Sequence, residues 1–323
     1  MSARTFSLAA ALEAWFADVK RPMPWRRRPT PYACWLSEIM MQQTTYATVL
    51  PYYRRFLARF PTVVDLAKAD EADVLKAWEG LGYYARARNL LKAAKTVVKD
   101  GRAVWPTNAA GWAALPGVGP YTAAALSSVL NGECVPVVDG NVARVFARMW
   151  KLTDDFSKQP NRAKLAARLQ PEIERSRVPG DFNQAMMELG ALVCTPTGPR
   201  CETCPLARAC ASRRDGTQAD YPVKPGKKPL PVRKATAVIV RDGEGRVLLV
   251  QNREGGLLKG LWELPAVEDG GGLTQVFSHF RLELSCVRAV RADAEFRDPQ
   301  SVPLTTATRK ALAAQGLIKG EPS

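Results

Sequence analysis

Four cysteines between residues 194 and 210 constrain this chain more than any other feature of its sequence. They read Cys194-x6-Cys201-x2-Cys204-x5-Cys210, and thiolates at this spacing can surround one metal centre. A structural zinc site usually presents two Cys-x2-Cys pairs, whereas only one is present here. One compact loop with unevenly spaced thiolates favours a 4Fe-4S cluster, with zinc as the alternative. Because all four iron corners would be ligated by the protein, we expect a structural or electronic role for the cluster.

Composition limits where such a protein acts. The chain has 323 residues and seven cysteines, an odd number that argues against a disulfide scaffold. Its 46 basic and 31 acidic residues give a formal net charge of +15, which favours a polyanionic partner, nucleic acid first. No apolar run is long enough to cross a membrane, and the N-terminal segment does not resemble a signal peptide. We therefore expect a cytoplasmic, nucleoid-associated protein with no membrane partner.

Proline and glycine residues divide residues 6–215 into segments whose apolar residues recur three and four apart, which predicts an all-α part. The expected helices are 120–130, 141–151, 182–193, 31–60 with an interruption near Pro51, and 73–99 with a break near Gly80 and Gly82.

Residues 222–234 hold four prolines and five basic residues, a composition typical of a linker. Beyond the linker, two β-rich runs are joined by Asp242-Gly243-Glu244-Gly245, which predicts a hairpin. Residues 235–323 are therefore expected to form a separate domain that is at least partly β.

A tight turn precedes one of the expected helices. Residues 115–119 read LPGVG and are followed by Pro120, which suits the first position of a helix. Gly117 and Gly119 allow the backbone to turn and to approach a ligand closely. The amides at this helix start can bind a DNA phosphate, although a short glycine motif of this kind also occurs in ordinary loops.

Two acidic residues of the helical part are candidates for chemistry. Glu38, flanked by Ile39 and Met40, would have a raised pKa if it faced a pocket, and the alternative is a solvated side chain on the outer face of a helix. Asp139 stands directly before an expected helix, where an N-cap is the ordinary role. The residues alone therefore indicate a candidate acid pair and no more.

Six motifs, in order, make the chain resemble one family. They are WLSEIMMQQT, GLGYYARARNL, LPGVGPYTAAAL, VDGNVARV, FNQAMMELGALVC and the cysteine loop. Over residues 6–221 the chain resembles adenine DNA glycosylases of the MutY type, which belong to a wider family with endonuclease III. The resemblance implies a monofunctional DNA N-glycosylase of base excision repair. Its partner would be double-stranded DNA in which adenine is mispaired with 8-oxoguanine or guanine, and we expect a monomer.

The resemblance also implies a mainly α architecture. Residues 1–221 would form a bilobal helix-hairpin-helix glycosylase with a DNA-binding cleft between its lobes. Residues 30–135 would make a six-helix lobe, and residues 1–29 and 136–221 the Fe-S cluster lobe. After the linker, residues 235–323 resemble a small α+β Nudix-like domain.

Roles for individual residues follow from the family motifs. Glu38 would protonate N7 of an adenine flipped out of the duplex and later act on the incoming water. Asp139 would stabilise positive charge at C1′ of the sugar. Further positions correspond to the sugar side of the pocket (Tyr121, Asn141), the surroundings of the flipped base (Trp25, Arg26, Gln184) and the wedge that fills the base stack (Gln43, Leu81, Tyr83). For Leu81 and Tyr83 the plainer interpretation is packing at a helix break.

The C-terminal domain resembles the module with which such enzymes inspect 8-oxoguanine. GLWELPA at 260–266 matches the start of the module, and FSHF at 277–280 matches the segment whose Ser278 and His279 approach the damaged base. Only ten residues separate the two motifs, Val267 to Val276, so the domain is shortened relative to the family. No glutamate-rich helix follows GLWELPA, which argues against a Nudix hydrolase.

Two other functions stay open at this point. An endonuclease III-like glycosylase with lyase activity carries a lysine two positions after the last glycine of the hairpin, where this chain has Tyr121. A non-catalytic Fe-S protein that binds DNA would not need the acid pair. The excess positive charge is expected on the DNA side, at the linker and at Arg86, Arg88, Arg144, Arg148, Arg200 and Arg208.

Overall fold

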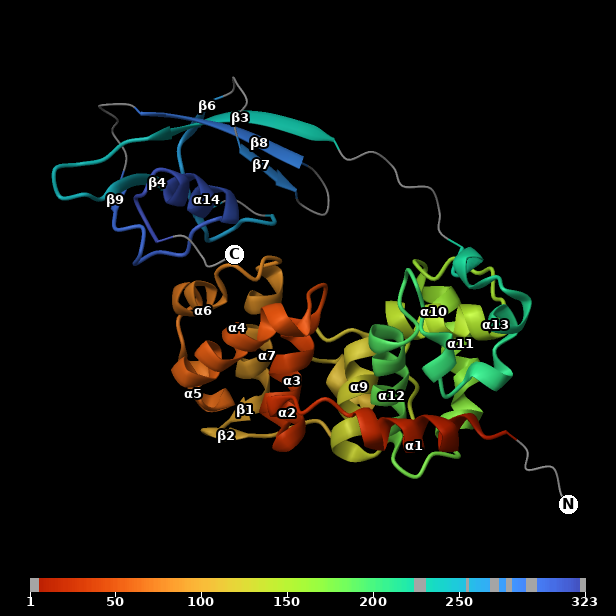
Figure 1. Cartoon of the computed structure of the whole chain (residues 1–323). Helices are drawn as coiled ribbons and strands as arrows, with labels where there is room; N and C mark the ends of the chain where they lie inside the picture. Colours follow the sequence, from red (N-terminus) through yellow and green to blue (C-terminus); the bar gives the residue numbers. More distant parts are fainter. Residues whose placement is uncertain are drawn as a thin grey trace, which may run out of the picture. The chain divides into compact units, whose positions relative to one another are not determined.

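The computed structural model describes residues 6–223, 231–253, 256–267, 273–276, 281–288 and 295–319. Contacts group the chain into two compact units (Figure 1). Unit 1 comprises Met1–Gln42 and Val104–Gly226, and unit 2 comprises Gln43–Ala103 and Lys227–Ser323. This grouping differs from the lobes expected from the resemblance, so those boundaries stay a prediction. Within the described ranges, no helix has both the length and the apolar character needed to span a membrane.

Unit 1 is helical. Its helices are α1 (Leu8–Val19), α2 (Pro24–Arg27), α3 (Pro31–Met41), α8 (Ala109–Ala113), α9 (Pro120–Asn131), α10 (Gly140–Trp150), α11 (Gln159–Ile173), α12 (Pro179–Leu192) and α13 (Ala211–Asp215). Short 3-10 turns cover Cys201–Thr203, Ala207–Ala209 and Gln218–Asp220.

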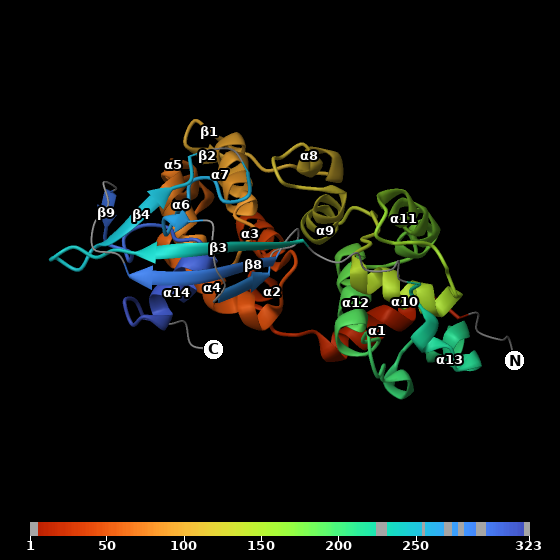
Figure 2. The same ribbon diagram turned by 90° about the horizontal axis from the view of Figure 1, so that it is seen from above.

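The core of unit 1 follows from apolar spacing. Helix α10 buries Val142, Val145, Phe146 and Met149, which are three and four residues apart and therefore form one stripe. In Figures 1 and 2 this helix lies beside α12, and α1 packs on α12 in the same cluster. These three helices form the scaffold that holds the residues before α10 and those on α12.

Unit 2 combines helices with strands. Its elements are α4 (Tyr46–Arg59), α5 (Val63–Lys68), α6 (Glu71–Trp78), α7 (Ala85–Val97), β1 (Val98–Lys99), β2 (Arg102–Ala103), β3 (Val232–Ile239), β4 (Val247–Gln251), β5 (Trp262–Glu263), β6 (Ala266–Val267), β7 (Leu273–Val276), β8 (Arg281–Arg288), β9 (Glu295–Arg297) and α14 (Thr306–Ala314). One sheet has the strand order β6-β3-β8-β7 and another β5-β4-β9. Figure 2 shows β3 and β8 side by side; they pair in parallel.

The predicted C-terminal hairpin is confirmed at its turn and in the antiparallel bridge between Arg241 and Val247, whereas the longer ladders of both strands involve other partners. The turn closes through Asp242 N to Arg246 O at 3.1 Å and Leu248 N to Val240 O at 2.9 Å. Beyond this point β3 pairs with β6 and β8, whereas β4 pairs with β5 and β9. The turn residues determine only the local reversal of the chain. The strands that form the longer ladders with β3 and β4 determine which sheet each of them joins.

The interruption predicted near Pro51 lies elsewhere. Helix α3 ends at Met41 and α4 begins at Tyr46, with Pro51 inside α4. Gln43 has φ of 59°, which a helix does not allow, and Thr45 caps α4 by accepting from Thr48 N. Proline removes one backbone hydrogen bond, but here it does not end the helix. The break predicted near Gly80 is confirmed, between α6 and α7.

Candidate active site

A cavity of about 370 Å³ opens in unit 1 between α2, α3, α9 and α12. This volume is within the range of small-ligand sites. Four residues expected near a flipped base line it: Trp25, Arg26, Glu38 and Gln184. The structure thus brings three separate segments of the chain to one cavity.

Glu38 lies half-buried in the wall of this cavity. Burial raises its pKa from 4.5 to about 7, since an ionised carboxylate is poorly solvated there. A hydrogen bond from Tyr121 opposes the rise, whereas the nearby Asp139 carboxylate adds to it. The solvated alternative for Glu38 is therefore excluded, and the carboxyl group is poised to donate a proton near neutral pH.

Tyr121, in the first turn of α9, contacts two residues that line the cavity, Glu38 and Met187. Its hydroxyl lies 3.3 Å from Glu38 Oε2 and 3.2 Å from Met187 Sδ. Burial, followed by the charge of Glu38, raises the Tyr121 pKa well above its usual value. The phenol therefore stays protonated and donates its hydrogen bond.

Asp139 caps α10 and is also part of this acid pair. Its Oδ1 accepts from Val142 N at 2.7 Å and its Oδ2 from Asn141 Nδ2 at 2.9 Å. Burial raises the Asp139 pKa above its usual value, and these hydrogen bonds limit the rise. The cap and the candidate catalytic roles are thus compatible, because one carboxylate has two oxygens.

A close approach between α10 and α12 fixes Asn141. A Cβ on Gly190 would lie 2.5 Å from Asn141 Cβ, so only glycine fits there. Arg144 Nη2 donates to Asn141 Oδ1 at 2.8 Å and to Gly190 O at 2.9 Å. Its Nε donates to Cys194 O at 2.8 Å. A chain of hydrogen bonds therefore runs from the cysteine loop to Asp139.

The four clustered cysteines line one small cavity in unit 1. None of the four forms a disulfide, and Cys201 Sγ accepts from Gln218 Nε2 at 3.6 Å. Among the described residues, no group of three or more His, Cys, Asp or Glu side chains is arranged to hold a single metal ion. A cubane does not require such a group, because each of its thiolates binds a different iron.

The expectation that Arg148 faces DNA is wrong. Only 3% of it is exposed, and its guanidinium donates to backbone oxygens of the cysteine loop and its flank, at Gln218, Tyr221, Thr195 and Pro196. It also lies 3.4 Å from Cys194 Sγ. Arg148 instead holds the cysteine loop in place, because its guanidinium makes many short hydrogen bonds within the protein.

The hairpin before α9 has the expected geometry. Gly117 takes φ of 78°, a left-handed conformation that favours glycine. Gly119 is the N-cap of α9 and supplies no side chain to the first turn. The start of this helix therefore has the character of an anion site.

The expected wedge residues Gln43, Leu81 and Tyr83 lie in unit 2. Gln43 and Tyr83 have φ of 59° and 48°, unusual for residues other than glycine. Tyr83 is 38% exposed. Leu81 is buried, which agrees with the alternative that it packs at a helix break. Arg86, expected at DNA, instead donates through Nη2 to Leu81 O at 3.1 Å and to Gly82 O at 3.3 Å. Exposed residues with a strained backbone, here Gln43 and Tyr83, concentrate at functional sites.

The expected 8-oxoguanine readers Ser278 and His279 lie outside the described residues. Near them in the chain, Gln275 and Val276 line a cavity of about 190 Å³ in unit 2 together with Leu81 and Tyr83. This cavity joins the candidate wedge to the C-terminal strands.

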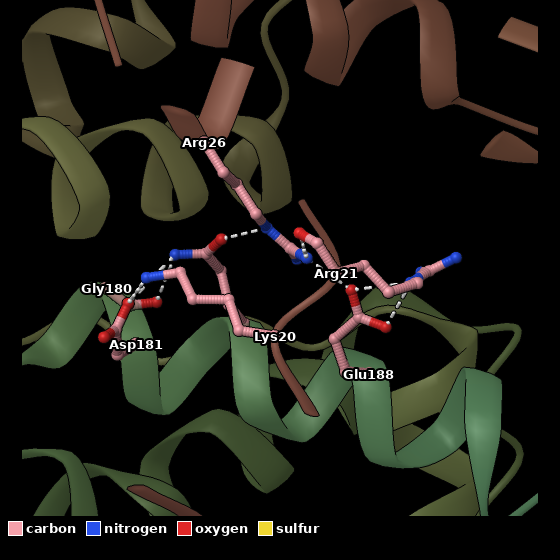
Figure 3. Close-up of polar contacts among 7 residues, drawn as sticks. Lys20, Arg21, Arg26, Gly180, Asp181 and Glu188 are labelled. Carbon is pink, nitrogen blue, oxygen red and sulfur yellow. Dashed lines mark hydrogen bonds and ion pairs between the residues drawn. The ribbon is translucent and has the colours of Figure 1, made fainter. Parts of the chain in front are cut away.

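Ion pairs at the cavity involve four residues that were not predicted from the sequence, Lys20, Arg21, Asp181 and Glu188, together with Arg26, which was. Arg21 and Arg26 both bind Glu188, and Lys20 binds Asp181 (Figure 3). The signal available was the spacing of Gln184 and Glu188, four apart and hence on one face of α12.

In sequence and in fold, the chain is similar to known DNA repair proteins. The pattern of the family described as HhH-GPD superfamily base excision DNA repair protein matches residues 36–171. The chain is 36% identical over 319 residues to the human adenine DNA glycosylase, covering 82% of this chain and 58% of that protein. It thus spans little more than half of the human protein's length. The adenine DNA glycosylase of Buchnera aphidicola subsp. Schizaphis graminum is 33% identical over 246 residues, covering 76% of this chain and 70% of that protein.

A solved structure, that of a thermostable thymine-DNA glycosylase, superposes with a TM-score of 0.58 at 26% identity. The match covers 64% of this chain and 95% of that one. The predicted fold class, mainly α with a smaller strand-containing C-terminal part, is thereby confirmed. Since 33% identity extends over 70% of the Buchnera protein, this chain belongs to the adenine DNA glycosylase family of the HhH-GPD superfamily.

Proposed function

We propose that this protein removes adenine paired with 8-oxoguanine or guanine by hydrolysing the N-glycosidic bond. The observation that carries the proposal is the raised pKa of Glu38 at the wall of a cavity, beside a second carboxylate. Relatives that share this chain's sequence are named adenine DNA glycosylases. As a monomer acting on duplex DNA, the protein would work in the cytoplasm at the nucleoid.

The chemistry needs one acid and one anion. Glu38 donates its proton to N7 of the flipped adenine, and the C1′–N9 bond breaks with its electron pair on the base. Asp139, ionised, stabilises the cationic sugar. Water then adds to C1′ and gives a proton to the Glu38 carboxylate, which restores the acid. Tyr121 and Asn141 hold the two carboxyl groups in place.

Tyr121 supports a monofunctional enzyme. Its phenol cannot form a Schiff base with C1′, unlike a lysine amine at the same position. The product would then be an abasic site on an intact strand.

The remaining expected residues complete the proposal. Gly117 and Gly119 would place the start of α9 at a DNA phosphate. Gln43, Leu81 and Tyr83 would fill the gap left by the flipped base. Ser278 and His279 would contact the opposite 8-oxoguanine.

Cys194, Cys201, Cys204 and Cys210 would hold a 4Fe-4S cluster, one thiolate for each iron. When bound, such a cluster would cross-link the loop, and the steps above need only the protein's own residues. Iron and sulfide in a ratio of one to one, four of each per chain, would support this assignment. One zinc per chain would contradict it.

The test of the function uses the purified protein and a duplex with one adenine opposite 8-oxoguanine. We expect strand cleavage at that adenine only after alkali treatment, and slower reaction opposite guanine. Cleavage without alkali, with a covalent complex trapped by borohydride, would indicate a lyase instead. Tight duplex binding without any excision would indicate a non-catalytic protein.

A further inference from the structure

A polar cluster in the cavity wall fixes the orientation of the Gln184 amide. Gln184 Oε1 accepts from Arg26 Nε at 2.6 Å, and Nε2 donates to Gly180 O at 3.2 Å. A guanidinium only donates and a carbonyl only accepts, so the amide nitrogen and oxygen cannot exchange places without loss of both bonds.

Arg26 is in turn held by Glu188 (Figure 3). Arg26 Nη1 donates to Glu188 Oε1 at 2.6 Å, and Arg21 Nε donates to Oε2 at 2.8 Å. Only 2% of Glu188 is exposed, and 12% of the Arg26 side chain. Charge-assisted bonds in such a site are short and directional, so the position of Arg26 depends on the carboxylate. Arg26 and Gln184 line the cavity, whereas Glu188 lies behind them.

A fixed amide can distinguish two purines of the same size. Adenine has an amino donor at C6 and an acceptor at N1, whereas hypoxanthine has a carbonyl acceptor at C6 and a donor at N1. Turning an amide by 180° exchanges its donor and acceptor in the same way. One fixed orientation therefore suits one of these bases, and a buried polar site that loses a partner rejects the other strongly. An amide free to turn accommodates both.

We infer that Glu188 is a positioning residue for base specificity: it holds Arg26, which holds Gln184 in the orientation that favours adenine over hypoxanthine. Glu188 touches no base itself. The inference rests on the proposed function, because it assigns a specificity to the same cavity.

The test measures single-turnover excision of adenine and of hypoxanthine, each opposite 8-oxoguanine, with enzyme in excess. The ratio of the two rates is taken within one preparation, so it does not depend on the active fraction. We expect the wild type to favour adenine, and Glu188→Gln to lower the ratio at least tenfold. Glutamine keeps the size of glutamate but has no negative charge, and its amide nitrogen only donates, so it cannot replace the charge-assisted bonds that both carboxylate oxygens accept from the two arginines.

Two further variants sharpen the test. Glu188→Asp keeps the charge on a shorter side chain and should give an intermediate ratio, and it carries the test if Glu188→Gln does not fold. Glu172→Gln removes an ion pair to Arg175 of 2.7 Å at the surface and should leave the ratio unchanged. A wild-type ratio in both Glu188 variants overturns the inference, as does a wild type without preference. A wild type that excises neither base overturns the proposed function instead.

Discussion

The Tyr121 hydroxyl lies 3.3 Å from Glu38 Oε2, so the candidate general acid has a neutral hydrogen-bond donor as its partner. This donor lowers the pKa of Glu38, whereas burial raises it by more. The balance sets the pKa at about 7, where a carboxyl group is still partly protonated at neutral pH.

The first prediction is a pH profile set by this balance. Excision needs protonated Glu38, so the single-turnover rate should fall about tenfold per pH unit above pH 7. Tyr121→Phe removes a bond that favours the ionised form, so the Glu38 pKa should rise and the alkaline limb should move to higher pH. Rates between pH 5 and 9 on one duplex test both statements. A limb that stays in place, or moves to lower pH, would contradict the role of Tyr121.

Glu38→Gln should stabilise the protein while it abolishes excision. The Glu38 pKa is higher in the folded protein than in the unfolded chain, so the folded state loses stability as the pH rises from about 4.5 to 7. Above pH 7 this loss is complete. The glutamine amide carries no charge to bury. The difference in the free energy of unfolding between variant and wild type should therefore be larger at pH 8.5 than at pH 5 by on the order of 2–3 kcal/mol. Urea unfolding at the two pH values measures this. Equal gains at both would show that charge burial is not the cause. Duplex binding should be retained.

Gly190→Ala should disturb the acid pair from a distance. The new methyl group would meet Asn141 Cβ at 2.5 Å, so α10 or α12 must shift. Such overpacking costs about 1–3 kcal/mol, and displacement of Asn141 would weaken its bond to Asp139. We expect at least a tenfold slower excision. Gly243→Ala is the matched control, because nothing lies within 4 Å of its Cβ position. Equal rates for both variants would argue against this packing relationship.

Much of the fold could be predicted because local signals decide it. The helix predicted to begin at residue 31 does begin there, with Thr30 as its N-cap, and Gly80 lies at the break before α7. Pro51 was misleading, since a proline inside a helix costs free energy that tertiary packing can offset. The pairing of β3 with β8 could not be predicted, because it joins strands far apart in the sequence and no turn residue encodes it.

The candidate site was only partly predictable for a similar reason. Motifs indicated Glu38 and Asp139, but their spacing in sequence carries no information on the burial that raises their pKa values. Arg148 was misassigned because charge alone does not distinguish a DNA contact from a buried donor to backbone oxygens. Glu188 was missed because its role depends on Arg26, which lies 162 residues away in the chain.

The last prediction concerns the contact between α6 and the C-terminal part of unit 2. Glu79, with a side chain 3% exposed, accepts from Leu304 N at 3.0 Å and lies 2.5 Å from Arg309 and 2.9 Å from Lys76. Breaking a fully buried ion pair costs about 3–5 kcal/mol, and the cost here should be smaller because the Arg309 and Lys76 side chains are 23% and 31% exposed. Glu79→Gln should therefore loosen residue 304 and α14, and speed hydrogen exchange of their amides while those of α10 and α12 stay protected. Glu244→Gln is the control, because the Glu244 side chain is 73% exposed in its pair with Arg246, and it should change neither set. Exchange that rises equally in α10 would mean global destabilisation and would argue against a local role for Glu79.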